Sequence, residues 1–319
     1  MALWGVPLTE LTQDPPFRNY LRLEKLGQGV YATIWKGRSR ITNKIVALKE
    51  TILDEEYGFP ETAMREASLL KDLEHPNVIR FYEAIATESM LTLVFDFCDS
   101  DLKQYMRQHG ALPLDVARSF MKQLLEGTAY CHKSNIIHRD IKPENVFLSS
   151  DGVLKLGDFG LSCTIGLPIK KYRNEVVTLW YRAPELLLGS TSYGPAIDVW
   201  SCGCILAEMI QGTPLCRGAD IQGQLNAISR ATEAPSRKEL ENMKKEAPEL
   251  DISASRFPWI FQWTLGRSVD KATPDAIELL EHLLEYNPAK RITATDALKY
   301  SYFISAQGPD LGEYDMDTS

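Results

Sequence analysis

The sequence predicts an α+β fold in which a small strand-rich part is followed by a larger helical part. Apolar and polar residues alternate over residues 21–26, as expected of a half-buried strand. Farther along the chain, Val116, Phe120 and Leu124 recur every four residues, as on the buried face of a helix. The character of the sequence changes near residues 97–99, so we expect the two parts to join there.

In the first part, the expected elements alternate with turn signals. Residues 1–19 contain three prolines and are expected to form an irregular N-terminal extension. A helix is expected to begin near Pro60, because a proline followed by an acid suits the first turn. Strands are expected at residues 21–26, 33–36, 44–49, 78–82 and 91–95.

In the second part, helices dominate the expectation. One long amphipathic helix contains residues 116–124. A second, over residues 199–206, is apolar on nearly every face, which is typical of a helix at the centre of a core. A last helix is expected over residues 275–284, and residues 305–319 form an acidic tail that we expect to be solvated.

The bulk composition narrows the function classes. The chain has 319 residues, 44% hydrophobic and 24% charged, which fits a globular protein of about two structural units. We see no run of about twenty apolar residues and no secretory signal, so we expect no membrane span and a location in the cytoplasm or nucleus. The net charge of −8 disfavours nucleic-acid binding as the main task but not nucleotide binding. Cys202 and Cys204 are the only close cysteine pair, so we expect free thiols rather than a zinc site.

A glycine-rich turn and a strand lysine point to a nucleotide. Gly27 and Gly29 lie between two expected strands, where glycine lets the backbone approach phosphates closely. Taken alone, this loop is equally well interpreted as a plain hairpin turn. A dinucleotide fingerprint would open a helix, but strand residues follow here. Lys49, on the expected strand 44–49, can reach phosphates, and Glu66, on the helix that follows, is its natural partner. The ordinary alternative is that both are separate surface charges. The order of loop, strand and helix favours an ion pair between them.

Residues 138–145 read His-Arg-Asp-Ile-Lys-Pro-Glu-Asn, and Asp158-Phe159-Gly160 follows after a short hairpin's length. The carboxylate of Asp140 can orient a substrate hydroxyl and accept its proton. Lys142 can neutralise a migrating phosphoryl group. Asn145 and Asp158 offer the oxygen ligands that Mg²⁺ prefers. At this spacing, the set predicts phosphoryl transfer from a magnesium-bound nucleotide.

A Glu–Arg pair is expected to lock the helical part. Glu185 ends an Ala-Pro-Glu triplet, and Arg291 lies near the C-terminus. We expect the two charges to be buried together, with ordinary surface charges as the alternative.

With these motifs the chain resembles the eukaryotic protein kinases over about residues 20–304, and within them the cyclin-dependent kinases. Three stretches carry the closer likeness: residues 60–66 resemble the cyclin-contacting helix, 91–98 the hinge, and 175–185 the end of the activation segment. The resemblance implies a bilobal kinase fold, with a β-rich N-lobe at about residues 20–97 and a mainly helical C-lobe at about residues 98–304.

The resemblance also implies ATP and Mg²⁺ as cofactors and assigns roles to individual residues. Asp140 would be the catalytic base, acting with Lys142, Lys49, Glu66 and Thr178. Asn145 and Asp158 would hold Mg²⁺. The implied nucleotide contacts are Gly27, Gln28, Gly29, Val30, Ile34, Ala47, Lys49, Phe95, Asp96, Cys98, Asp101, Asn145, Phe147 and Asp158.

The partners follow from the same resemblance. A cyclin-like protein would bind the helix that runs from Pro60 to Glu66 and swing Glu66 inward. Protein substrates would carry Ser or Thr followed by Pro, because Val176 and Arg182 occupy the positions that form the proline pocket. Two alternatives stay open: a kinase-shaped scaffold without catalysis, and a kinase of small molecules.

The chain departs from the family at the activation segment. Arg173 stands where most members have a phosphorylated Thr. Of the three arginines that clamp that phosphate, Arg65 and Arg139 are present, but the third position holds Cys163. We therefore expect activation without a phosphate here, with Glu175 or the partner supplying negative charge. The usual preference for a basic residue three positions after the target should then be weak.

Smaller departures concern regulation and the region after the activation segment. Tyr31 keeps the position of an inhibitory tyrosine, whereas Val30 replaces a usual inhibitory threonine. The stretch Leu-Cys-Arg-Gly at residues 215–218 replaces a Phe-Pro-Gly segment.

Overall fold

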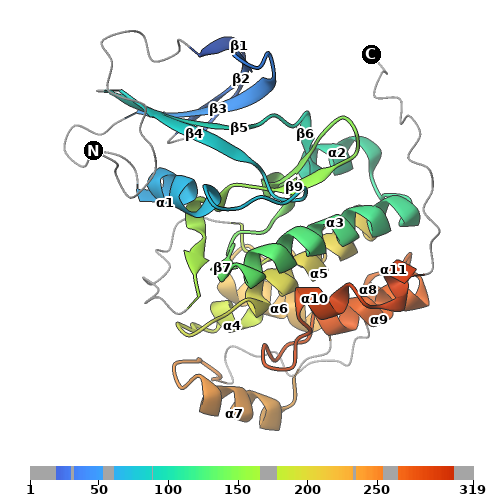
Figure 1. Ribbon diagram of the computed structural model, residues 1–319. Coiled ribbons are helices and arrows are strands. Elements are labelled where there is room, and N and C mark those ends of the chain that lie inside the picture. The colour runs from blue at the N-terminus through green and yellow to red at the C-terminus, as the bar shows by residue number, and fades with distance from the viewer. Residues whose placement is uncertain are drawn as a thin grey trace. The chain divides into compact units, whose positions relative to one another are not determined.

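The computed structural model describes residues 19–29, 32–52, 61–87, 89–165, 178–232, 235–253 and 265–304. The chain forms two compact units, labelled by element in Figure 1. The sheet unit comprises the described residues up to Ser100 together with Phe147–Ser162. The helical unit comprises Asp101–Val146 and the described residues from Cys163 onward. The segment Phe147–Ser162 thus belongs with the sheet unit, although it falls inside the range expected for the helical part.

The sheet unit is built on five antiparallel strands in the order β1-β2-β3-β5-β4. The strands are β1 (Tyr20–Gln28), β2 (Thr33–Ser39), β3 (Ile45–Ile52), β4 (Phe81–Ala86) and β5 (Met90–Asp96). They cover most of the residues that the sequence analysis assigns to strands. The strand expected to start at residue 78 begins only at Phe81, because Val78 instead forms a parallel bridge with Leu156.

The two faces of β3 have different surroundings, because successive side chains of a strand point to opposite faces. Val46 and Leu48 lie in a buried cluster with Tyr20, Ile85 and Val94. Ala47 and Lys49 therefore lie on the other face of the strand. Burial of one face fixes the register of β3, and with it the face from which Lys49 projects.

Helix α1 (Glu61–Leu70) packs against the short helix η2 (Phe159–Leu161) within the sheet unit. Its buried residues are Ala63, Glu66, Ala67 and Leu70, spaced as on one helical face. The strands β8 (Val146–Leu148) and β9 (Leu154–Leu156) precede η2. Asn77 donates from Nδ2 to the Leu154 carbonyl, 2.9 Å away, which helps to hold this segment in the sheet unit.

The helical unit is centred on α5 (Ala196–Gln211), whose residues are buried from Ile197 through Ile210. Helices α3 (Leu114–Lys133) and α9 (Pro274–Leu283) pack against it. All three correspond to helices expected from the sequence. The remaining elements are β6 (Ser100–Asp101, at the boundary of the units), α2 (Leu102–His109), β7 (Ile136–Ile137), η1 (Pro143–Asn145), β10 (Cys163–Thr164), α4 (Pro184–Leu187), α6 (Ile221–Ala231), α7 (Arg237–Glu246), α8 (Leu265–Ser268), α10 (Ala294–Ala297) and α11 (Ser301–Ile304).

The expected Glu–Arg pair is present and buried. Arg291 binds Glu185 through two parallel contacts, Nη1–Oε1 at 2.8 Å and Nη2–Oε2 at 3.0 Å. The side chains are 0% and 4% exposed. The pair joins the start of α4 to the segment before α10. The six cysteines are free thiols, as expected. Among the described residues, no helix has the length and apolar character needed to cross a membrane.

Candidate active site

In the sheet unit, Lys49 lies between two carboxylates. Its Nζ is 2.7 Å from Glu66 Oε2 and 3.2 Å from Asp158 Oδ1. Lys49 is on β3, Glu66 is on α1, and Asp158 directly precedes η2. Three segments that are distant in sequence therefore meet at one ammonium group.

The charges in this cluster are strongly coupled. Burial lowers the pKa of Lys49, but the carboxylates of Glu66 and Asp158 outweigh it and raise that pKa well above its usual value. Lys49 therefore keeps its charge at physiological pH. Glu66 is only 2% exposed, and burial raises its pKa; the charge of Asp158 adds to the effect and Lys49 opposes it. The cluster holds two acids and one cation, so a further cation near Asp158 would be attracted to it.

Arg65 ties α1 to the residues around Asp158. Its Nη1 donates to the Gly160 carbonyl at 3.2 Å, and its Nη2 lies 2.9 Å from Glu61 Oε1. The backbone N–H of Phe159 also donates to Glu66. Helix α1 is therefore fastened to the Asp158-Phe159-Gly160 segment from two neighbouring positions.

In the helical unit, Asp140 is held from two sides. Lys142 Nζ lies 2.7 Å from Asp140 Oδ2. Asn145 Nδ2 donates to the same oxygen at 3.0 Å and to the Asp140 backbone carbonyl at 2.8 Å. Because the amide nitrogen of Asn145 is used in this way, its amide oxygen is left as an acceptor for a cation. The carboxylate of Asp140 is oriented before any substrate arrives.

Asp198 anchors the backbone that carries Asp140, and sequence reasoning missed it. Its Oδ2 accepts the N–H of His138 at 2.8 Å and lies 2.9 Å from His132 Nε2; its Oδ1 accepts the N–H of Arg139 at 2.8 Å. Burial works against ionisation, but His132, the charge of His138 and the backbone donor together lower the pKa of Asp198. An acid in the first turn of an otherwise apolar helix was the signal that could have found it.

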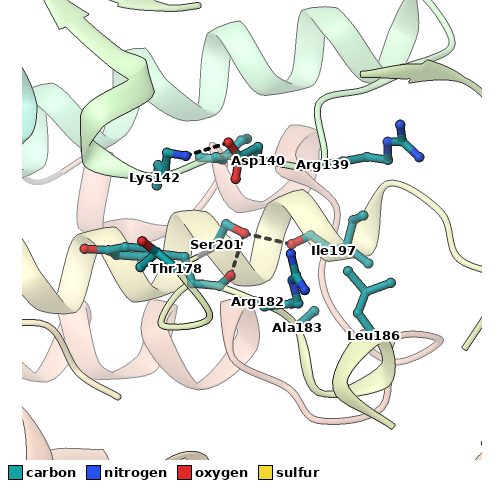
Figure 2. A pocket seen from close by; sticks show the side chains of 11 residues that line it. Arg139, Asp140, Lys142, Thr178, Arg182, Ala183, Leu186, Ile197 and Ser201 are labelled. Atoms are coloured by element: carbon teal, nitrogen blue, oxygen red, sulfur yellow. Dashed lines mark hydrogen bonds and ion pairs between the residues drawn. The ribbon is translucent and has the colours of Figure 1, made fainter. Parts of the chain in front are cut away.

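Asp140 is one of the residues that line a pocket in the helical unit (Figure 2). Figure 2 shows the Lys142 ammonium directed at Asp140. Ser201 Oγ donates to the carbonyl of Tyr181 at 2.8 Å and also lies 3.2 Å from the Ile197 carbonyl, which links three of the lining residues. The lining residues are Arg139, Asp140, Ile141, Lys142, Thr178, Tyr181, Arg182, Ala183, Leu186, Ile197 and Ser201. Three predicted catalytic residues, Asp140, Lys142 and Thr178, therefore share one pocket.

The other predicted nucleotide residues are distributed over both units. In the sheet unit, Asp96 is bound through its side chain by Tyr82 and Lys155, so only its backbone is left for an adenine. Burial raises the pKa of the Cys98 thiol to about 12, so the thiol stays protonated. In the helical unit, the Asp101 carboxylate caps α2 by accepting the N–H of Gln104 at 2.8 Å. Gly27, Gln28, Gly29, Ile34, Ala47, Phe95 and Phe147 belong to the sheet unit, with Asp96 and Cys98.

Several predictions fall on residues outside those that the structure describes. They concern Val30 and Tyr31 in the glycine-rich loop, Pro60 before α1, and Arg173, Glu175 and Val176 in the activation segment. The terminal segments 1–18 and 305–319 are outside as well. Because these residues lie outside the described part of the chain, the roles assigned to them stay predictions.

The whole chain was compared with models of known protein families. Residues 20–303 match the model of the protein kinase domain. The chain belongs to the protein kinase family. The α+β bilobal kinase fold predicted from the sequence is thereby confirmed, and the clusters around Lys49 and Asp140 belong to a protein kinase. Kinases of this family generally use ATP and Mg²⁺.

Proposed function

We propose that this protein kinase has the activity of the cyclin-dependent kinases. It transfers the γ-phosphoryl group of ATP to the hydroxyl of a Ser or Thr residue that is followed by proline. The surroundings of Asp140 support this most directly. Its carboxylate is oriented by Lys142 and Asn145, and it shares a pocket with the exposed Thr178. In the reaction, the substrate hydroxyl gives its proton to Asp140 while its oxygen forms a bond to the γ-phosphorus. The bond between that phosphorus and the bridging oxygen breaks, and ADP leaves.

The charged groups in each unit fit a magnesium-bound triphosphate. Asp158 and Asn145 offer a carboxylate and an amide oxygen, the hard ligands that Mg²⁺ prefers. Lys49 is kept charged by its two carboxylate neighbours and would bind phosphate oxygens. Lys142 would offset charge on the transferred group. Mg²⁺ held at Asp158 or at Asn145 would offset the negative charge of the phosphates.

A cyclin-like partner at the helix that begins near Pro60 is part of the proposal. Within the described part of that helix, Glu66 is buried and bonded to Lys49, which is the arrangement that such a partner would stabilise. Selection for proline would involve Arg182, which lines the Asp140 pocket.

Activation without a phosphate is the second part of the proposal. Arg65, a residue of the expected phosphate clamp, is engaged by Gly160 and Glu61. Arg139, the second, donates from Nη1 to the hydroxyl of Tyr193 at 3.0 Å. Cys163 at the third position cannot form a charge-assisted bond to phosphate. The two arginines therefore have structural partners that need no modification.

The test is a kinase assay on the intact chain with Mg-ATP and a Ser-Pro peptide, with and without added cyclins. Turnover that rises with one cyclin, and is lost by about 10²–10⁴-fold in Asp140→Asn, is expected. Phosphatase treatment should leave partner-stimulated turnover intact. Nucleotide binding with no turnover of any peptide would favour the scaffold alternative. Loss of all turnover after phosphatase treatment would rule out phosphate-independent activation.

A further inference from the structure

Arg217 lies on the surface of the helical unit, close in space to the residues that line the Asp140 pocket. Its guanidinium carbon is 5.8 Å from the ring centroid of Trp180, and the side chain is exposed. Trp180 directly precedes Tyr181, which lines the pocket. Thr178, another lining residue, is two positions away. Arg217 is therefore placed beside the surface on which a protein substrate would lie.

The loop that carries Arg217 is fastened to this surface by a hydrogen-bonded network. Trp180 Nε1 donates to the Gly218 carbonyl at 3.2 Å, and Gln224 Nε2 donates to the Trp180 carbonyl at 3.3 Å. The N–H of Gly218 donates to Gln224 Oε1 at 2.7 Å. Gln224 is completely buried. A Cβ atom added to Gly218 would come within 2.2 Å of the backbone nitrogen of Gln224, so the two residues approach closely. The backbone at Arg217 is thus held against Trp180 and cannot move away without breaking these contacts.

The positive charge of Arg217 is not compensated locally. The other cation near the Trp180 ring, Lys103, is 2.8 Å from Glu208 Oε1 and is neutralised by it. Asp220, three residues after Arg217, caps α6 by accepting the N–H of Gly223 at 2.6 Å. Among the described residues, no carboxylate lies within ion-pair distance of Arg217. Glu208 is thus paired with Lys103, and Asp220 with the start of α6.

We propose that Arg217 is a specificity-determining residue that binds an anionic side chain of the protein substrate near the phosphoacceptor. This rests on the proposed function, in which Asp140 phosphorylates a peptide in the adjacent pocket. A guanidinium held over an aromatic face loses less freedom on binding than a mobile lysine, and its planar fork matches carboxylate and phosphate oxygens. The substrate side chain is accordingly that of Asp or Glu, or of an already phosphorylated residue.

The experiment uses the full chain with its activating partner and a set of Ser-Pro peptides. Ala, Asp, Lys or phosphoserine is placed in turn at each position on either side of the target, and kcat/KM is measured. At one position, Asp should be preferred over Ala by about two- to five-fold, as expected of an exposed ion pair. A larger gain with phosphoserine than with Asp would identify phosphate as the preferred anion, and the reverse order would identify carboxylate.

The variant Arg217→Glu should lose this preference and select Lys at the same position, while Arg217→Lys should keep part of it. Arg267→Glu, at an exposed arginine of α8, makes the same change of charge elsewhere and should leave the selection profile unaltered. Thermal unfolding of each variant checks that it is folded. A flat profile in the wild-type chain, selection of basic residues, or an unchanged profile in Arg217→Glu would overturn the inference alone. Failure to turn over any peptide would refute the proposed function together with it.

Discussion

Replacing Arg291 by Met should be among the most destabilising single changes in the helical unit. Arginine has five N–H donors, and all five are used here. Two go to the Glu185 carboxylate. The other three go to the backbone carbonyls of Glu285 at 2.8 Å, Ala196 at 2.8 Å and Tyr286 at 3.2 Å. The guanidinium also lies 5.1 Å from the centre of the Trp200 ring.

The expected cost follows from the burial of the pair. Glu185 is 4% exposed at its side chain, so Arg291→Met would leave a carboxylate buried without its cation. Breaking a buried pair in this way costs about 3–5 kcal/mol. In a unit of about 200 residues, this lowers the melting temperature by roughly 6–20 °C. Glu185 lies two residues after Ala183, which lines the Asp140 pocket. Loosening of this segment in Arg291→Met should therefore lower kinase activity even at temperatures below the melting temperature of the variant.

Urea denaturation followed by tryptophan fluorescence measures the loss. The double variant Glu185→Leu with Arg291→Met removes both charges and should recover part of the stability, because the unpaired carboxylate is gone while three backbone carbonyls still lack their donor. Arg267→Met, at an exposed arginine, should change the free energy of unfolding by less than about 0.5 kcal/mol. If Arg291→Met cost no more than this exposed control, or if the double variant were as unstable as the sum of its parts, the reasoning would be wrong.

Two further predictions concern contacts near the catalytic groups. Asp198→Asn should reduce the free energy of unfolding most at neutral pH. The pKa of Asp198 is lower in the folded protein than in the unfolded chain, so its carboxylate contributes fully to stability above the unfolded-state pKa and loses that contribution as pH falls through the folded-state pKa. The difference between variant and wild type should therefore shrink below about pH 4. Denaturation curves over a pH series measure it, and a difference that grew on acidification would contradict it. Arg65→Gln removes the hydrogen bond that ties α1 to Gly160, two residues after the proposed Mg²⁺ ligand Asp158. The loss of one hydrogen bond worth about 1 kcal/mol should then raise KM for Mg-ATP by about five-fold. Arg65→Lys should restore part of that affinity. If phosphatase treatment of the wild-type enzyme raised KM as much as Arg65→Gln does, Arg65 would serve a phosphate instead.

Sequence patterns were enough to predict the five strands of the main sheet and the helices α1, α3, α5 and α9. Alternation indicated the first strand, and the apolar stretch at residues 199–206 indicated the central helix α5. The candidate site was predicted less completely. The order of loop, strand and helix pointed to Lys49 and Glu66 as partners, and they lie 2.7 Å apart. An acid in an apolar helix marked Asp198 as unusual, but nothing in the sequence indicated that this residue, 58 positions after Asp140, would accept the backbone N–H groups of His138 and Arg139.

The segment Phe147–Ser162 shows the same limit. The spacing between the motifs at residues 138–145 and 158–160 leaves room for a short hairpin, but the membership of this segment in the sheet unit depends on contacts with residues about 77 positions earlier. The bridge between Val78 and Leu156 and the bond from Asn77 to the Leu154 carbonyl both join segments far apart in the chain. Such pairings depend on how neighbouring elements pack, so propensity alone does not predict them.

Backbone strain explains why these distant contacts matter for the chemistry. Four non-glycine residues in the described part have positive φ, and three of them, Asn43, Asn135 and Asp158, are of types that tolerate this conformation. Arg139, at 71°, is not of such a type, and both Arg139 and Asp158 (59°) adjoin or supply the catalytic groups. Each such residue costs about 1–3 kcal/mol and persists only when its surroundings enforce it. Asp198 enforces the turn at Arg139 through two backbone N–H groups, and Lys49 holds the side chain of Asp158. The short motifs therefore supply the reactive groups, whereas a helix and a strand far away in sequence supply the conformation in which those groups can act.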